Sequence, residues 1–423
     1  MPAFYVLGVF IAGILTGFKI QVNTPSQVLI ITLSFFILLK SVRAQGENTR
    51  FLLLIMVFLA GLIRPSFCAI SVLPESLFAN FQDMISPLRD SLVYGIGYGL
   101  SETHRELIGG IILGRGSGTI EIKNWTHFVN SGMSHLLVAS GAQVSLTVYP
   151  IILLAEHLGF PARMRNLLFV TAGAMLLLLL LLVGQEPSIL RAITACYFYL
   201  AARLINRKAY SLNIIYVTAL IWLFANPDLV HNIGFRLSYV ASWGLIYIYP
   251  RLKKLIPIPR IILSMTSKSR FIRIIFTSIY EIALLCASAQ LAVIPVLAFH
   301  FHRISPSGFI ANVIAIPVCE LATYAGLASA VLFQIYEPAS GFLNAGNSYL
   351  LLWLDSIAHY FAGVPYIFSG KIHWLGLILP YVFTGLYMEA RFRPYSIISS
   401  MQNLYRITHP IEFLKDELLS GRE

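Results

Sequence analysis

Long runs of apolar residues constrain this chain more than any other feature of its sequence. Residues 167–183 and 374–387 contain no charged side chain. Similar runs recur along the whole chain, of which 57% is hydrophobic and only 12% is charged. A bilayer core about 30 Å thick is crossed by about 20 apolar residues in a helix, and backbone groups at that depth must be hydrogen-bonded within their own segment. The sequence therefore predicts an all-α, polytopic integral membrane protein.

The apolar runs predict about ten to twelve transmembrane helices. The candidate helices occupy residues 3–18, 27–39, 51–73, 136–156, 167–183, 188–203, 211–225, 234–250, 275–299, 308–335, 346–363 and 372–390. They divide the chain into N-terminal transmembrane helices (1–73), an extracytoplasmic or interfacial segment (74–135), a main transmembrane domain (136–390) and a cytoplasmic tail (391–423). In the second region, residues 76–100 and 102–113 mix apolar and polar side chains at helical spacing. This pattern is typical of amphipathic helices at a membrane interface, and a small extracytoplasmic cap is the alternative.

The positive charge of the chain follows the rule that basic residues stay on the cytoplasmic side of a membrane. The formal net charge is +11, from 30 basic and 19 acidic residues. If all twelve runs span and the N-terminus is inside, twenty of the 30 basic residues fall in cytoplasmic loops and the tail. Membrane insertion therefore accounts for most of this charge, and a nucleic-acid ligand is not needed to explain it.

Two arginines break that rule, because Arg191 and Arg236 each lie about three residues inside a helix that starts on the outer side. Helical rise places them about 5 Å below the outer surface. They could snorkel to the lipid headgroups. Alternatively, they could face a water-filled cavity and bind phosphates, for which the planar guanidinium is well suited.

Other polar residues are expected at a similar depth. Gly141, preceded by Ser140 and followed by Gln143, weakens the fourth helix inside the membrane, where irregular backbone is tolerated only against protein or water. Gln290 and Asn312 reach a comparable level in later helices. Each alone is typical of a hydrogen bond between helices, but their shared depth indicates a vestibule.

Five motifs occur in a fixed order along the central part of the chain. They are the Gly-x-x-His-Leu-Leu and Ser-Gly-x-x-Val sequences within 132–144, Pro-x-x-x-Arg-Ala at 187–192, Gly-Phe-x-Leu-Ser at 234–238, Ser-Ala-Gln-Leu-Ala followed by Pro295, and Ala-Asn-Val-Ile-Ala-Ile-Pro at 311–317. In this order they resemble the channel domain of the ComEC-type competence proteins, which carry single-stranded DNA into bacterial cells. The resemblance covers about residues 105–320.

The resemblance implies a multi-pass protein of the bacterial cytoplasmic (inner) membrane, with a competence-type channel domain at 136–390. It implies single-stranded DNA as the transported partner, membrane lipids around the helices, a surface DNA receptor outside, a separate nuclease, and a cytoplasmic helicase or single-strand-binding protein inside. The residues expected along the DNA path are His135, Ser140, Gly141, Gln143, Arg191, Arg236, Ser238, Gln290 and Asn312. Bases could stack on Tyr239 or Trp243.

This sequence departs from the family pattern in two respects. Where the family usually has Leu-His-Val after the Ser-Gly pair, this chain has Ala142-Gln143-Val144, so an imidazole is replaced by an amide. Long members also carry an OB-type domain and a metallo-β-lactamase-like domain, neither of which is expected here.

No metal site, cofactor or catalytic activity is expected from the sequence. A dinuclear hydrolytic site needs a dense cluster of histidines and carboxylates. The one His-x-His sequence, at 300–302, is followed by Arg303 and Ile304 and has no carboxylate beside it. The four cysteines show no Cys-x-x-Cys spacing and are interpreted as small apolar residues.

Two alternative functions remain open at this point. Glu281, Glu320 and Asp355 lie within candidate helices, and carboxylates inside a membrane are typical of proton-coupled transport. The first alternative is therefore a proton-coupled transporter of a small anion or a lipid. The second is a family member that folds but conducts nothing, which the loss of the motif histidine favours.

Overall fold

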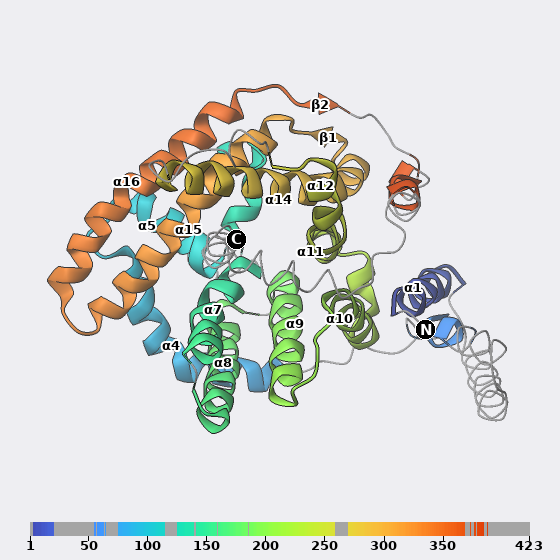
Figure 1. Ribbon diagram of the computed structural model, residues 1–423, viewed down its shortest axis with the longest axis horizontal. Coiled ribbons are helices and arrows are strands. Elements are labelled where there is room, and N and C mark those ends of the chain that lie inside the picture. The colour runs from blue at the N-terminus through green and yellow to red at the C-terminus, as the bar shows by residue number, and fades with distance from the viewer. Residues whose placement is uncertain are drawn as a thin grey trace, which may run out of the picture.

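The computed structural model describes residues 3–20, 55, 57–62, 64, 75–114, 125–138, 141–158, 160–184, 186–258, 270–368, 373, 376–377, 379–384 and 387. These residues are almost entirely helical (Figure 1). The first half comprises α1 (Ala3–Ile20), α4 (Glu75–Gly97), α5 (Glu102–Leu113), α6 (Trp125–Asn130), the 3₁₀ turn η3 (Ser134–Leu137), α7 (Gly141–His157), α8 (Ala162–Val183) and α9 (Pro187–Leu204). The second half comprises α10 (Ser211–Ala225), η4 (Pro227–Val230), α11 (Ile233–Trp243), the π-helical turn η5 (Gly244–Ile248), α12 (Tyr249–Leu255), α14 (Arg270–Phe301), α15 (Ser307–Phe333) and α16 (Glu337–Ala362).

Two short strands are the exception to this helical architecture. β1 (Arg303–Ile304) follows α14, and β2 (Ile367–Phe368) follows α16. They pair in antiparallel fashion, with Arg303 opposite Phe368 and Ile304 opposite Ile367. The pair joins the ends of α14 and α16, as Figure 1 shows.

Three helices are long and apolar enough to cross a membrane within the part of the chain that the structure describes. They are Ala162–Val183, Ile272–Phe301 and Ser307–Phe333. Two shorter apolar helices, Val6–Phe18 and Ser211–Ala225, accompany them. The all-α membrane class predicted from the sequence is confirmed, whereas the expected number of ten to twelve spans stays a prediction.

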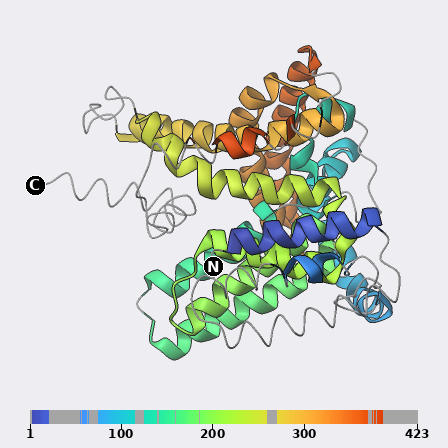
Figure 2. The same cartoon turned by 90° about the vertical axis from the view of Figure 1, so that its right-hand side faces the viewer.

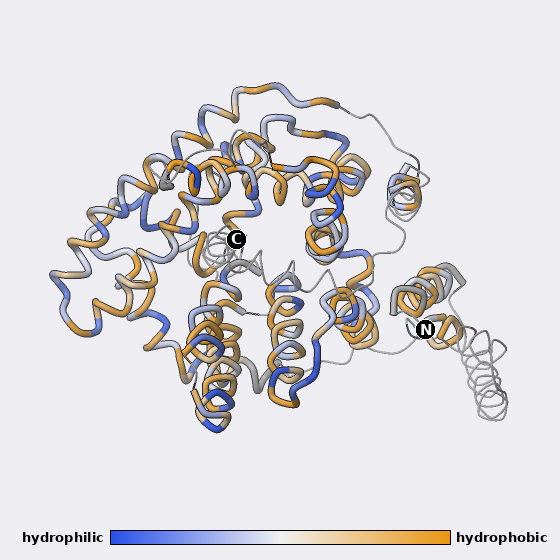
Figure 3. The backbone as a smooth tube through the Cα atoms, viewed as in Figure 1, coloured by the Kyte–Doolittle hydropathy of each residue, from blue (hydrophilic) through white to orange (hydrophobic). Residues whose placement is uncertain are grey.

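The helices pack in two groups that meet around a central region (Figures 1 and 2). In one group α15 packs against α16, α4 and α5. In the other α7 packs against α8 and α9, and α10 packs against α9 and α1. α14 joins the two groups, because it contacts both α11 and α15. Figure 3 shows that the helices carry mostly hydrophobic residues, while the connection between α9 and α10 is hydrophilic.

The expected interfacial helix at 102–113 is instead packed inside the protein over its second half. All seven residues from Leu107 to Leu113 are buried. They face α15 and α16, and a Cβ at Gly326 of α15 would lie 2.8 Å from a methyl carbon of Ile112. An interfacial helix would present its apolar side to lipid. Here that side forms part of the main hydrophobic core.

Other helix boundaries differ from the expected ones in ways that affect the site. The run at 136–156 is divided between η3 and α7, which begins at Gly141. The run at 234–250 contains the π-helical turn η5. That turn lies against α14, because a Cβ at Gly244 would be 2.6 Å from the carbonyl oxygen of Ser288. The absence of a side chain at Gly244 therefore allows the close approach that positions α11. The expected run at 27–39 and the tail at 391–423 lie outside the described residues.

Candidate functional site

A cavity of about 3020 Å³ lies between α7, α9, α11, α14 and α15. One face of α9 lines it from end to end, through Ser188, Arg191, Ala195, Tyr199 and Arg203. These positions are three or four apart, so they share one side of the helix. α9 has 18 residues and is therefore about 27 Å long at 1.5 Å per residue. The cavity thus extends over a length close to the thickness of a bilayer core.

The helices on the other side of the cavity show the same spacing. α14 contributes Ile282, Cys286, Gln290, Val293, Leu297 and Phe301. α15 contributes Asn312, Ile316, Cys319, Glu320 and Thr323. Most of the lining surface is apolar, but polar and charged side chains from several helices interrupt it. These side chains determine what the cavity can bind.

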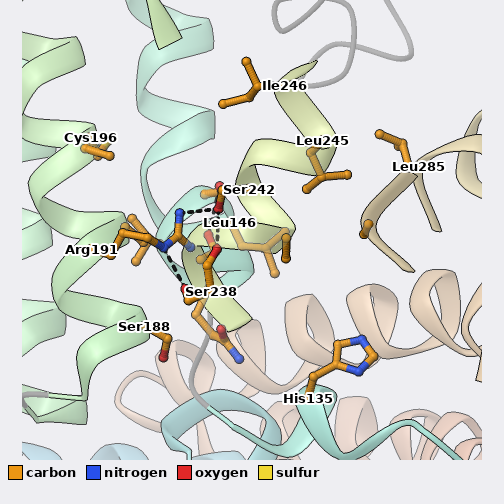
Figure 4. Close-up of a pocket in the computed structure, with 18 of the residues that line it drawn as sticks. His135, Leu146, Ser188, Arg191, Cys196, Ser238, Ser242, Leu245, Ile246 and Leu285 are labelled. Atoms are coloured by element: carbon orange, nitrogen blue, oxygen red, sulfur yellow. Dashed lines mark hydrogen bonds between the residues drawn. The ribbon is translucent and has the colours of Figure 1, made fainter. Parts of the chain in front are cut away.

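Arg191 lines the cavity and is held there by two serines of α11 (Figure 4). Its Nε donates a hydrogen bond to Oγ of Ser238 at 2.7 Å, and its NH1 donates to Oγ of Ser242 at 2.6 Å. Ser238 and Ser242 are one turn apart on α11, and Oγ of Ser242 in turn donates to the carbonyl oxygen of Ser238 at 2.8 Å. The guanidinium carbon also lies 5.9 Å from the centre of the Tyr239 ring. We call Arg191, Ser238 and Ser242 the serine end of the cavity.

These contacts leave part of the guanidinium group of Arg191 available. The group has five N–H donors, and the serines accept from Nε and NH1 alone. NH2 lies 3.1 Å from the position that a Cβ of Gly141 would occupy, so the glycine at the start of α7 gives the guanidinium space. None of the described residues forms an ion pair with Arg191. The arrangement presents an oriented positive charge that suits a phosphate or carboxylate group.

Three predicted amide residues line the same cavity. Nε2 of Gln143 donates to the carbonyl oxygen of Ile111 in α5, so this side chain ties α7 to the buried helix. Asn312 is 6% exposed, and its Oδ1 has no hydrogen-bond partner among the described residues. Gln290 lies beside Gly308 near the start of α15, with Nε2 at 3.4 Å from the position of a Cβ on that glycine. The amides add neutral hydrogen-bonding capacity to an otherwise apolar wall.

The structure brings together most of the residues predicted for the DNA path. Seven of them line the cavity: His135, Gly141, Gln143, Arg191, Ser238, Gln290 and Asn312. His135 lies in the turn η3 and is exposed there. Ser140 lies outside the described residues.

Arg236 is the exception, because it does not line the cavity. Its Nε donates to the carbonyl oxygen of Val230, and its NH1 lies 2.7 Å from Nε2 of His300 at the end of α14. Arg236 and Ser238 are two residues apart on α11, which turns them about 200° away from each other around the helix axis. Since Ser238 faces Arg191, Arg236 points elsewhere, and the expected pair of arginines in one vestibule does not form.

The two aromatic residues expected to stack on bases are also not in the lining. Tyr239 is only 9% exposed, and Trp243 stacks on Tyr247 with ring centres 4.9 Å apart. Both rings lie on the side of α11 that packs against other helices. Tyr149, Tyr199, Tyr324 and Tyr366 are aromatic residues that do line the cavity.

Several lining residues were not identified from the sequence. Ser242 has a clear signal in retrospect, because it lies one helical turn after Ser238. Arg165, Arg203, Arg207 and Lys208 are among the twenty basic residues that the sequence places in cytoplasmic loops, and they line the cavity as well. Arg203 forms an ion pair with Glu156 of α7 and donates to the hydroxyl of Tyr199 at 3.2 Å. The part of the chain that the structure describes has no group of three or more histidines, cysteines or carboxylates that could hold a metal ion.

The fold and the cavity define a helical membrane protein with a mostly apolar cavity along its helices that also carries polar and charged side chains. The Competence protein family matches residues 111–393, and the chain belongs to this family. Among curated proteins it is similar to ComE operon protein 3 of Bacillus subtilis (strain 168), with 25% identity over 266 residues. The aligned part is 63% of this chain and 31% of that relative, so the match spans about a third of the longer protein. No solved structure matches the chain. The resemblance to the ComEC-type family is thereby confirmed.

Proposed function

We propose that this chain forms the path by which single-stranded DNA crosses the bacterial cytoplasmic membrane during natural competence. The observation that carries the proposal is the cavity of about 3020 Å³, whose lining follows one face of α9 over its whole length. The membership of the competence family supports the same function. In this proposal the strand enters at the serine end, where Arg191 binds a backbone phosphate.

The chemistry of the lining suits a strand of any sequence. Phosphate contacts carry affinity but no base information. Arg191 is already oriented by Ser238 and Ser242, so binding a phosphate requires little further ordering of its side chain. Asn312 and Gln290 offer amide groups that can bind sugars, phosphates or base edges.

A direct test uses cysteine labelling on two positions of α9. Ala195 lines the cavity, whereas Ala201 is exposed and lies outside the lining. In a chain without its four native cysteines, we expect a bulky membrane-impermeant thiol reagent at Ala195→Cys to block uptake of labelled DNA. The same reagent at Ala201→Cys should leave uptake unchanged. Equal uptake by the two labelled variants and by the unlabelled proteins would exclude the cavity as the DNA path.

We also propose that the chain itself performs no hydrolysis, and that a separate nuclease, a surface DNA receptor and a cytoplasmic helicase or single-strand-binding protein act with it. A hydrolytic metal centre needs several closely spaced ligands, and the described residues contain no such group. Incubating purified protein with duplex and single-stranded DNA and divalent cations tests this. Degradation that copurifies with the chain and stops with chelator would contradict it.

One observation favours the alternative of proton-coupled transport. Of the three carboxylates in candidate spans, Glu320 lines the cavity, whereas Glu281 is paired with Lys253 and accepts from the hydroxyl of Tyr249. The Glu320→Gln variant separates the two functions. A DNA path needs no titrating group at this position, so we expect DNA uptake to persist; a proton-coupled transporter would lose its activity.

A further inference from the structure

Four basic residues line the cavity at the opposite end of α9 from Arg191. We call Arg165, Arg203, Arg207 and Lys208 the basic end. Arg165 lies in the first turns of α8, and the other three lie where α9 leads into α10. In the sequence these residues belong to loops whose charge is explained by membrane orientation. The orientation of the protein in the membrane requires positive charge on the cytoplasmic side. It does not require these residues to line a cavity.

The connection between α9 and α10 is held in a defined turn. Asn206 has a φ of 52°, in the left-handed region. The N–H of Asn206 donates to the carbonyl oxygen of Arg203 at 3.1 Å, and the N–H of Arg207 donates to that of Ala202 at 2.7 Å. This pair of hydrogen bonds is a Schellman motif, which ends a helix and reverses the chain. As a result, every residue from 206 to 211 lines the cavity.

The basic end carries an excess of available positive charge. Arg203 is neutralised by its ion pair with Glu156. Arg207 and Lys208 are exposed and Arg165 is half-buried. Within the described ranges, the side chains of these three residues have neither an ion pair nor a hydrogen bond. Three positive charges therefore face one end of the cavity, about 18 Å along α9 from Arg191, since Arg191 and Arg203 are twelve residues apart.

We propose that Arg165, Arg207 and Lys208 form a second phosphate-binding site for single-stranded DNA, at the end of the cavity opposite the serine end. This inference rests on the proposed function. The site binds the backbone of a strand that has passed the middle of the cavity, where no lysine or arginine lines the wall. Two phosphate sites separated by a stretch without basic side chains favour passage, because the strand is bound at each end and is not held along the whole wall.

Anionic lipid headgroups offer the same phosphate chemistry, and the chain contains a matched control for them. Arg163 is two residues from Arg165 in the same helix start, is exposed, and does not line the cavity. The two arginines contribute equally to the cytoplasmic charge that orients the protein. Only Arg165 faces the cavity, so a DNA site and a lipid or orientation role make different predictions for this pair.

The first experiment measures binding of a fluorescent oligothymidine to the purified full chain in discs of neutral lipid. Affinity for single strands falls with salt by a logarithmic slope of about 0.7 per phosphate contact. We expect Arg165→Gln to reduce the slope by about 0.7. The triple variant Arg165→Gln, Arg207→Gln, Lys208→Gln should reduce it by about 2. Arg163→Gln should leave the slope unchanged. Equal slopes for wild type and the triple variant would refute the site. Equal effects of Arg163→Gln and Arg165→Gln on the slope would also refute it. So would a triple variant that weakens binding of anionic vesicles and leaves oligothymidine binding unchanged.

The second experiment uses cells that take up labelled DNA and separates failure of the site from failure of the proposed function. If cells without the chain take up DNA as well as cells with it, the proposed function is wrong. If the wild-type chain restores uptake and the triple variant restores it equally, only the basic end is wrong. We expect the triple variant to restore uptake at least fivefold less well than the wild-type chain. The double variant Arg165→Lys, Arg207→Lys keeps the charge and the orientation, so it should restore most of the uptake.

Discussion

The Nε atom of Arg191 on α9 donates a hydrogen bond to Oγ of Ser238 on α11 at 2.7 Å. Because Ser242 accepts a second hydrogen bond from NH1 at 2.6 Å, two neighbouring turns of α11 fix the plane of the guanidinium. A charged group inside a membrane protein is costly unless it is hydrogen-bonded or hydrated. The serines meet this requirement with neutral partners, so the positive charge stays available to a ligand.

Arg191→Gln is expected to lower DNA uptake about tenfold or more, while leaving membrane insertion and protein level intact. A hydrogen bond to a charged group contributes about 1.5–3 kcal/mol, and about 1.4 kcal/mol corresponds to a factor of ten in binding. Arg191→Lys should restore part of the uptake only, because an ammonium group lacks the planar fork that reaches both serines and a phosphate. Uptake of labelled DNA at equal expression is the measurement. Full activity of both variants would show that Arg191 only stabilises the packing of α9 on α11.

Arg236→Gln is expected to reduce stability without reducing uptake per folded molecule. Arg236 donates to Val230 and contacts His300 outside the cavity, so the loss of these hydrogen bonds should cost about 1.5–3 kcal/mol. The thermal unfolding of purified protein in detergent measures the stability, and labelled DNA uptake divided by protein level measures the function. A drop in uptake at unchanged stability would place Arg236 on the DNA path after all.

Gly244→Ala is expected to destabilise the protein by about 1–3 kcal/mol, because an added methyl group has no space. Its Cβ would lie 2.6 Å from the carbonyl oxygen of Ser288 and 2.7 Å from Cβ of Ala292. Gly346→Ala on α16 is the control, since nothing lies within 4 Å of its added Cβ. Thermal unfolding of both variants in the same detergent tests the comparison, and equal unfolding temperatures would contradict it.

Asn206→Gly is expected to keep the wild-type stability, whereas Asn206→Val should lose about 1–2 kcal/mol. The φ of 52° at this position suits glycine and asparagine, and the Cβ of a β-branched residue meets the following carbonyl oxygen there. Because the turn also presents Arg207 and Lys208 to the cavity, Asn206→Val should weaken oligothymidine binding as well. Matching stability of the glycine and valine variants would show that the turn is not constrained.

The sequence determined the class of the protein and identified several of the polar residues that line the cavity. Apolar runs and backbone hydrogen bonding allow only helices in a bilayer, and the described residues are almost entirely helical. The motifs placed Gly141, Arg191 and Asn312 on a common path, and all three line one cavity. These properties are local, since they depend on residue type and on spacing within single segments, and a single sequence carries that information.

Tertiary structure alone decided which faces of the helices meet. Arg191 and Arg236 occupy like positions near the starts of their helices, yet the rotation of α11 directs Ser238 and Ser242 to the cavity and Arg236 to His300. In the same way, only packing distinguishes Arg165 from Arg163, and only packing buries Leu107–Leu113 against α15. The rotation of each helix about its axis depends on contacts between residues far apart in the chain, such as Gly244 with Ser288. Hydropathy and depth indicate that a residue lies in a span and at which level, but not which neighbouring helix its side faces, so they leave that rotation undetermined.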